Sequence, residues 1–347
     1  MTGRIKDLLT PPLRRTPAPA APTPAGLQRA PTAPARPVDT QQFAPSVTAA
    51  GLNPAVSAER QKATFERVFK LGKLLVSQGK VPVIVIDHRL TAMDDRPIIK
   101  AGLQDLARRN NVTELLDVDA ALANGTLKSL PGYTEQASDH WRAQHPELVA
   151  KYPQVFGGEG SRLNIGFMSH SPREANATAG LAELAQRWAV ETGGKGQIVF
   201  AGSGTGTLAD FVNVYSRPKA QGGAGLENPD VRFGAPSPSA AATARAQALV
   251  QTYNQQHQDE EPVRLDQDSA GKAGWIETIE GEQGPNGEEK VVAAFIDDRA
   301  DNRIGAEGAA KLGQNLIAIK ADAPGLSFSQ NDDANENQIS TFSPNPQ

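Results

Sequence analysis

One stretch limits what this chain can fold into more than any other: residues 81–97, VPVIVIDHRLTAMDDRP. Its apolar residues run from Val81 to Ile86 without polar alternation and end directly at Asp87. Such a run predicts a strand that is buried on both faces of a sheet. A buried carboxylate must be paired, hydrogen-bonded or bound to a metal. Because ligands of open α/β sheets bind beyond the carboxyl ends of the strands, Asp87 is either a functional residue or the start of a capping loop.

A second stretch has the same form. Residues 290–303, KVVAAFIDDRADNR, place an apolar strand from Val291 to Ile296 immediately before the adjacent acids Asp297 and Asp298. Two parallel strands that bring carboxylates to one edge of a sheet would create a cation site, since Mg²⁺ prefers oxygen ligands and takes few of them from protein. The two stretches together predict a magnesium site.

Four segments together resemble a known family. DHRLT at 87–91, followed by Asp94, Arg96 and Pro97, resembles the first motif of the haloacid dehalogenase (HAD) superfamily, a strand followed by Asp-x-Asp-x-Thr. FIDD at 295–298 is similar to the fourth, metal-binding motif, and IVFAGSG at 198–204 resembles the second. Lys272, at the start of the short helix expected at KAGWIETIE (272–280), is a candidate for the lysine of the third motif, with a better spacing than Lys219 or Lys290. The resemblance covers roughly residues 80–325 in the family's order.

The resemblance implies a fold and a reaction. The fold is α/β, a three-layer Rossmann-like parallel sheet with a small helical cap-type insertion. The reaction is Mg²⁺-dependent hydrolysis of a phosphate ester or anhydride through an aspartyl-phosphate. Asp87 would be the nucleophile, and Asp87, Asp297 and Asp298 would bind the metal.

The resemblance also assigns supporting roles. Thr91 would hold the loop after the nucleophile, and Lys272 would balance charge, although an exposed surface lysine is the alternative for the latter. Ser203 would donate a hydrogen bond to a phosphoryl oxygen, and Gly202 and Gly204 would let backbone amides approach it. The alternative for this segment is a glycine-rich structural turn. A dinucleotide-binding Rossmann enzyme ranks behind, because its Gly-x-Gly-x-x-Gly pattern needs glycine where residue 207 is threonine.

One position departs from the family's pattern. The second aspartate of the first motif, which serves as general acid and base in phosphatases of this type, is replaced by Arg89. An arginine cannot donate a proton and take it back at neutral pH, and such help is typically worth about 10²–10⁴-fold in rate. Arg89 could instead clamp the phosphoryl group or another anionic part of the substrate. Two hypotheses therefore stand: an enzyme whose substrate needs no acid, or a pseudoenzyme that serves as a binding or adaptor protein.

Composition divides the chain into regions. With 347 residues, 39% hydrophobic residues, 5% aromatic residues and 26 prolines, part of it should be disordered. We expect a disordered Pro/Ala-rich arm at 1–56, one α/β domain at 57–325 with a cap-like insertion at about 110–170, and a disordered tail at 326–347. Within the domain, residues 57–77 and 98–109 have helical spacing of apolar residues. The Gly/Pro-rich first half of residues 216–262 indicates a loop, and AAATARAQALVQTYNQQ a helix.

Charge and cysteine usage limit the class of partner. A formal net charge of −4 gives no electrostatic case for nucleic acid or an anionic membrane, and no apolar run approaches the ~20 residues that span a bilayer. The expected partner is a small phosphorylated molecule, with a protein partner through the N-terminal arm as a further hypothesis. The chain has no cysteine, which fits a reducing cytoplasm or an exported protein that avoids thiols. The first residues lack the apolar region of a conventional signal peptide, so the cytoplasm is favoured.

Overall fold

The computed structural model describes residues 54–89, 91–132, 135–163, 172–178, 180–202, 207–258 and 262–320. The first helix, α1 (Pro54–Ser77), begins slightly before the expected domain start at residue 57. The disorder predicted for the rest of the arm and for the tail lies outside the described residues, as do Ser203 and Gly204. Within the described ranges, every helix is too short or too polar to cross a membrane.

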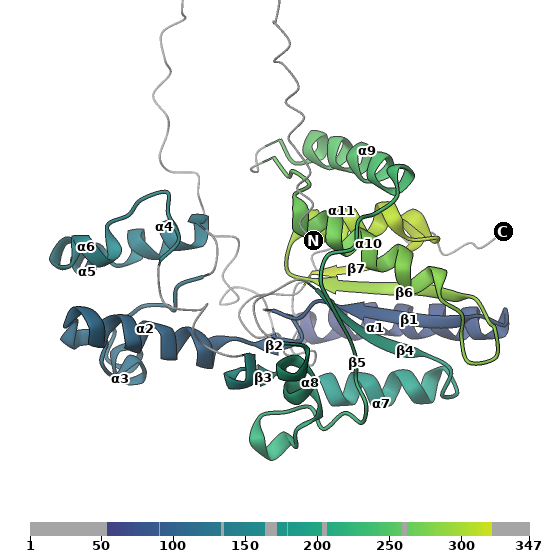
Figure 1. Ribbon diagram of the computed structural model, residues 1–347, viewed down its shortest axis with the longest axis horizontal. Coiled ribbons are helices and arrows are strands. Elements are labelled where there is room, and N and C mark those ends of the chain that lie inside the picture. Colours follow the sequence, from purple (N-terminus) through teal and green to yellow (C-terminus); the bar gives the residue numbers. More distant parts are fainter. Residues whose placement is uncertain are drawn as a thin grey trace, which may run out of the picture. The chain divides into compact units, whose positions relative to one another are not determined.

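The described residues form an α/β fold around one five-stranded sheet, consistent with a Rossmann-like fold (Figure 1). Its strand order is β5 (Asp230–Phe233), β4 (Gln197–Gly202), β1 (Val81–Ile86), β6 (Lys290–Asp297) and β7 (Ile317–Lys320). All four neighbouring pairs are parallel. The α/β class and the parallel sheet predicted from sequence are therefore confirmed.

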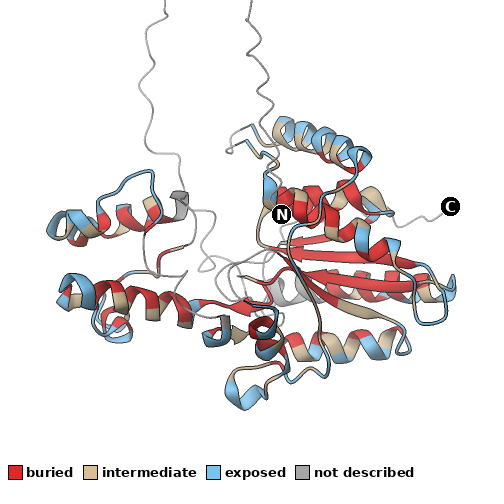
Figure 2. Ribbon diagram, viewed as in Figure 1, coloured by how far each residue is buried: buried red, intermediate tan, exposed pale blue. Residues whose placement is uncertain are grey.

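The apolar runs form strands because helices cover both faces of the sheet. Ile84 and Ile86 of β1 pack into one core cluster with residues of α1, α7 (Leu181–Glu191) and α8 (Leu208–Ser216). Val83 and Val85 point the other way and pack against α9 (Ala240–Gln256), α10 (Gln267–Gly281) and α11 (Ala300–Ala309). Figure 2 shows β1 and β6, in the middle of the sheet, as buried along their whole length. The sheet is thus the middle of three layers.

The strand order creates a position suited to ligand binding. After β1 the chain adds β4 and β5 on one side, then returns to add β6 and β7 on the other. The switch in direction therefore lies between β1 and β6, where successive connections leave the sheet in opposite senses. In open α/β sheets ligands bind at such a switch point, beyond the carboxyl ends of the strands. Asp87 follows β1, and Asp297 ends β6.

A helical insertion with its own core interrupts the chain after β1. It contains α2 (Arg96–Asn110), α3 (Val118–Ala123), α4 (Glu135–Gln144), α5 (Pro146–Lys151), α6 (Pro153–Phe156) and the 3₁₀ turn Thr113–Leu115. Leu103, Trp141 and Phe156 lie in a separate hydrophobic cluster that extends from Ile99 to Leu163. The two-residue strands β2 (Met93–Asp94) and β3 (Asn176–Ala177) pair antiparallel at its two ends. Further 3₁₀ turns lie at Pro172–Glu174, Lys219–Gln221 and Gly313–Asn315.

Two local expectations need correction. The Gly/Pro-rich segment read as a loop contains β5, an edge strand in which the polar residues Asp230 and Arg232 alternate with Val231 and Phe233. Lys272 was expected at the start of a short helix, but α10 begins at Gln267, so Lys272 lies inside it. An Asp266 capping box starts that helix a full turn earlier than the apolar pattern indicates. The helix expected at AAATARAQALVQTYNQQ is confirmed as α9.

Candidate metal centre

Three carboxylates meet at the carboxyl ends of β1 and β6. Asp87, Asp297 and Asp298 each place one carboxylate oxygen within 4.8 Å of the others. The strand register causes this, because Ile86 pairs with Ile296 and the Asp87 amide donates to the Ile296 carbonyl at 2.9 Å. Asp297 is fully buried, and Asp87 is 7% exposed. The structure thus brings together the three residues that the sequence predicts as metal ligands.

Lys272 reaches this cluster from α10. Its ammonium donates hydrogen bonds to Asp87 Oδ1 and, at 3.2 Å, to the Ala201 carbonyl, and it lies 3.8 Å from Asp297 Oδ2. Burial lowers the pKa of Lys272, but attraction by Asp87, Asp297 and Asp268 outweighs it and raises the pKa above the ordinary value. Lys272 is therefore a buried cation in direct contact with the predicted nucleophile.

The cluster holds more negative charge than its described surroundings neutralise. Burial raises the pKa of Asp87, even with Lys272 beside it. Burial, with repulsion by Asp87, raises the pKa of Asp297 well above its ordinary value and that of Asp298 to about 7. Excess buried charge of this kind is costly unless a counter-ion neutralises it. An all-oxygen donor set suits a hard divalent cation such as Mg²⁺, so the residues present fit the predicted metal.

Residues of α11 hold Asp297 in place. The Asn302 amide donates to both carboxylate oxygens of Asp297 at 3.0 and 3.1 Å, and the Arg299 backbone amide donates to Oδ1 at 2.9 Å. The Arg303 guanidinium donates to the Asp297 carbonyl at 2.8 Å. No sequence pattern assigns a role to these residues. Asn302 lies only five positions after Asp297, but Asp297 ends a strand and Asn302 lies in the helix that follows, so no single periodicity links the two.

A tight turn follows Asp87 and contains Arg89 and Thr91. It is closed by the Ala92 amide, which donates to the Asp87 carbonyl at 3.1 Å. Arg89 Nη1 donates to Oδ1 of the fully buried Asp95 at 3.3 Å, so its guanidinium is held by a carboxylate of the protein. Thr91 is buried, and its carbonyl accepts a hydrogen bond from Thr178 Oγ1 at 2.6 Å. The turn is thereby tied to the segment that follows β3.

His88 links the end of β1 to β5. Its Nε2 lies 3.1 Å from the Arg232 carbonyl, which can only accept, so Nε2 carries the proton. Nδ1 then accepts from the Tyr215 hydroxyl at 2.8 Å. Burial lowers the pKa of His88 to about 3, so the ring is neutral. Nothing in the sequence around His88 predicts its contact with Tyr215, because that partner lies 127 residues away in the chain.

Gly202, the last residue of β4, has a steric role in this structure. A methyl group at its Cβ position would lie 2.7 Å from Asp87 Oδ1 and 2.8 Å from Lys272 Nζ. Only glycine therefore leaves room for the Asp87–Lys272 ion pair at this point. Gly202 was predicted to bind substrate, and this observation gives it a second reason to be glycine. The predicted partners Ser203 and Gly204 lie outside the described residues.

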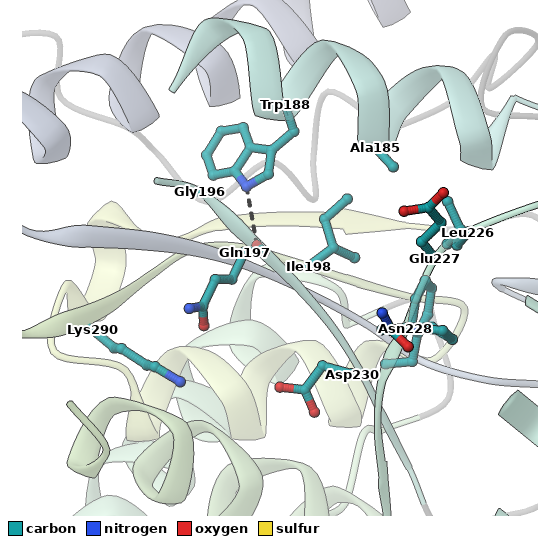
Figure 3. Close-up of a pocket in the computed structure, with 12 residues that line it drawn as sticks. Ala185, Trp188, Gly196, Gln197, Ile198, Leu226, Glu227, Asn228, Asp230 and Lys290 are labelled. Atoms are coloured by element: carbon teal, nitrogen blue, oxygen red, sulfur yellow. Dashed lines mark hydrogen bonds between the residues drawn. The ribbon is translucent and has the colours of Figure 1, made fainter. Parts of the chain in front are cut away.

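A separate hollow of about 420 Å³ lies at the opposite edge of the sheet (Figure 3). Its lining includes Gln197, Asp230 and Lys290, the first residues of β4, β5 and β6. The buried and half-buried charges there are paired: Arg232 binds Asp230 at 2.6 Å and Glu282 at 2.9 Å, and Lys290 binds Glu282 at 2.9 Å. The hollow is thus distinct from the carboxylate cluster.

Comparisons with family models, with curated proteins and with solved structures gave no match. The geometry of the site therefore carries the functional argument.

Proposed function

We propose that the chain is a HAD-like, Mg²⁺-dependent phosphohydrolase that acts through an aspartyl-phosphate on Asp87. The observation that carries the proposal is the cluster of buried Asp87 and Asp297 with half-buried Asp298, and Lys272 beside it, at the switch point of a parallel sheet. Its residues follow one another along the chain in the order of the family's motifs. Strongly shifted carboxyl pKa values in such a position favour a functional site over a structural ion pair.

In this proposal each residue of the site has its own role in the reaction. The Asp87 carboxylate attacks phosphorus, and water then attacks the aspartyl-phosphate to regenerate the carboxylate. Lys272, which donates to Asp87 Oδ1, favours the ionised form of that carboxylate against the effect of burial and offsets charge on the phosphoryl group. Asn302 and Arg299 fix the Asp297 carboxylate for metal binding. Bound Mg²⁺ supplies charge neutralisation at the phosphoryl oxygens.

The helical insertion is the proposed substrate-selecting element. It leaves the domain through β2, which directly follows the Asp87 turn, and returns through β3. Its separate hydrophobic cluster lets it act as one unit. Insertions placed next to a catalytic turn are suited to select substrates and to exclude water.

The test is release of phosphate from a generic aryl phosphate, then from acyl phosphates and nucleotides, with and without Mg²⁺. We expect metal-dependent release by the parent and none above background by Asp87→Asn. Asp230→Asn, which removes a carboxylate at the opposite edge of the sheet, is the matched control and should retain release. Equal release by the parent and Asp87→Asn would exclude the aspartyl-phosphate mechanism.

One observation favours a second candidate function, a binding or adaptor protein without turnover. Arg89 occupies the position of the family's general acid, and its guanidinium is held by Asp95. If no compound releases phosphate while Mg²⁺ still binds, the second candidate is correct. The Pro/Ala-rich arm at 1–56 is then the first segment to test for a protein partner.

A further inference from the structure

We infer that phosphoryl transfer to Asp87 proceeds without protonation of the leaving group, and that the substrates are phosphoryl compounds whose leaving group is stable as an anion. Acyl phosphates, phosphoanhydrides and esters of acidic phenols or enols belong to this class. The inference rests on the proposed function and adds the substrate class to it.

The first observation concerns Arg89. It lies in the same tight turn as Asp87, two residues further along the chain, at the position where the resemblance places the general acid. A guanidinium has only donors and stays charged in proteins, so it cannot give up a proton and recover it in each cycle. The carboxylate nearest to it, Asp95, is fully buried and accepts from Arg89 Nη1. Asp95 is therefore engaged in holding Arg89.

The second observation concerns the other described side chains that carry a polar hydrogen beside Asp87. Lys272 directs its ammonium at Asp87 and at the Ala201 carbonyl. His88 donates through Nε2 to the Arg232 carbonyl, and the Tyr215 hydroxyl donates to His88 Nδ1. These contacts direct the hydrogens at acceptors within the protein.

The remaining candidates beside Asp87 are a hydroxyl and two carboxyls. Thr91 Oγ1 is buried without a hydrogen-bond partner, but an alcohol hydroxyl is too weak an acid to protonate a leaving oxygen. Asp297 and Asp298 are the proposed metal ligands and must be ionised to bind Mg²⁺. Among the described side chains around Asp87, none is therefore arranged to protonate a leaving oxygen.

The chemical step balances without an acid. An Asp87 carboxylate oxygen forms a bond to phosphorus while the bond from phosphorus to the leaving oxygen breaks. The electron pair of the broken bond stays on that oxygen, which departs as a carboxylate, phosphate, phenolate or enolate. Arg89 adds a positive charge that attracts this anion. Water then attacks phosphorus, the electron pair of the Asp87–phosphorus bond returns to the carboxylate, and the water proton leaves with the phosphate product or enters solvent.

The experiment is a leaving-group series at saturating Mg²⁺, from nitrophenyl phosphate to unsubstituted phenyl phosphate, with acetyl phosphate as the acyl member. We expect kcat/KM to fall by about 10²-fold or more from the nitrophenyl to the phenyl ester, since the missing acid is worth about 10²–10⁴-fold. Acetyl phosphate should be turned over at least as well as the nitrophenyl ester. A parent profile that does not depend on leaving-group acidity overturns the inference.

Two variants at position 89 test whether the absence of an acid causes the dependence of kcat/KM on the leaving group. Arg89→Asp supplies an acid at the same position and should raise kcat/KM for the phenyl ester by about 10²-fold or more, with little gain for the nitrophenyl ester. Arg89→Gln removes the charge without adding an acid and should keep the steep profile. If Arg89→Asp unfolds beside Asp95, the double variant with Asp95→Asn replaces it, and the parent profile alone still decides. Failure of every compound with the parent contradicts the proposed function, whereas a flat profile contradicts only this inference.

Discussion

The parallel strands of the sheet have buried or half-buried charged residues at both of their ends. The carboxyl edge, where the strands end, and the amino edge, where they begin, differ in how these charges are paired. At the carboxyl edge, the three carboxylates of Asp87, Asp297 and Asp298 lie near two described cations, Lys272 and Arg303. At the amino edge, Asp230 and Glu282 are matched by Arg232 and Lys290 in a continuous chain of ion pairs. Similar residue types thus produce a cluster with an excess of negative charge at one edge and paired charges at the other.

The difference shows how a functional site can be separated from a structural ion pair in one molecule. A balanced chain of ion pairs holds strands and helices together and requires nothing from outside the protein. An unbalanced buried cluster costs stability until a counter-ion binds. The charge excess at the carboxyl edge, not the mere presence of acids, is therefore the argument for a metal.

The comparison is tested most strongly by removing one buried lysine from each edge. Lys272→Met removes the buried cation that contacts Asp87 and should lower the free energy of unfolding of the metal-free protein by about 3–5 kcal/mol. Lys290→Met leaves Glu282 paired with Arg232 and should cost only about 1 kcal/mol or less. Urea unfolding with and without Mg²⁺ measures both. Equal losses in the two variants, or rescue of both by Mg²⁺, would contradict the distinction between the edges.

The second prediction concerns space at the carboxyl edge. In Gly202→Ala the new methyl group would lie 2.7 Å from Asp87 Oδ1, so the carboxylate or the lysine must shift. A displacement of about 1 Å can cost on the order of 10²-fold in rate, and we expect kcat to fall by that amount. Gly281→Ala, where the methyl group meets no atom within 4 Å, is the control. Unchanged kcat in Gly202→Ala would show that the Asp87–Lys272 contact does not matter for turnover.

Much of the carboxyl edge can be predicted from sequence, because burial leaves a local pattern there. Unbroken apolar runs predict β1 and β6, and the acids that end them predict the cluster. The amino edge leaves no such pattern: β5 is an edge strand that alternates polar and apolar residues within a Gly/Pro-rich segment, and the sequence reads as a loop. Strands β2 and β3, of two residues each, are too short for any periodicity.

Side-chain contacts of the site leave no pattern in the sequence. His88 pairs with Tyr215, 127 residues away, through side-chain geometry that only the folded chain creates. Asn302 and Asp297 lie close together in the sequence, but one is in a helix and the other ends a strand, so periodicity does not indicate their contact either. Site residues that directly follow an apolar strand can therefore be predicted from sequence more readily than site residues that reach the site through tertiary packing.

The third prediction tests whether Asn302 fixes the metal ligand. Asn302→Ala removes the amide that donates to both oxygens of Asp297 and should weaken Mg²⁺ binding by about 10–100-fold. Isothermal titration of Mg²⁺ measures the affinity directly. Asn315→Ala, an exposed asparagine beside β7, is the control and should bind Mg²⁺ as the parent does. An unchanged Mg²⁺ affinity in Asn302→Ala would show that Asn302 does not position the Asp297 carboxylate for metal binding.

The smallest expected effect is a pH dependence of the metal-free protein. Burial and repulsion by Asp87 raise the folded-state pKa of Asp298 from 3.8 to about 7. A raised carboxyl pKa leaves stability intact below the unfolded value and removes it as pH rises toward the folded value. The free energy of unfolding should therefore fall between about pH 4 and 7, and Asp298→Asn should recover about 1–3 kcal/mol at pH 8 but little at pH 4. Chemical unfolding at both pH values, after chelation, measures this. A gain of the same size at both pH values would show that charge is not its cause.

If Asp87 is the nucleophile it becomes phosphorylated during turnover, and acid-quenched peptide mapping by mass spectrometry detects this modification. The parent is mixed with acetyl phosphate, or with nitrophenyl phosphate, in the presence of Mg²⁺ and quenched within the first turnover. The account predicts one phosphoryl group on the peptide that contains Asp87, absent after chelation and absent in Asp87→Asn. A phosphoryl group on another residue, or phosphate release without any modification of Asp87, would contradict it.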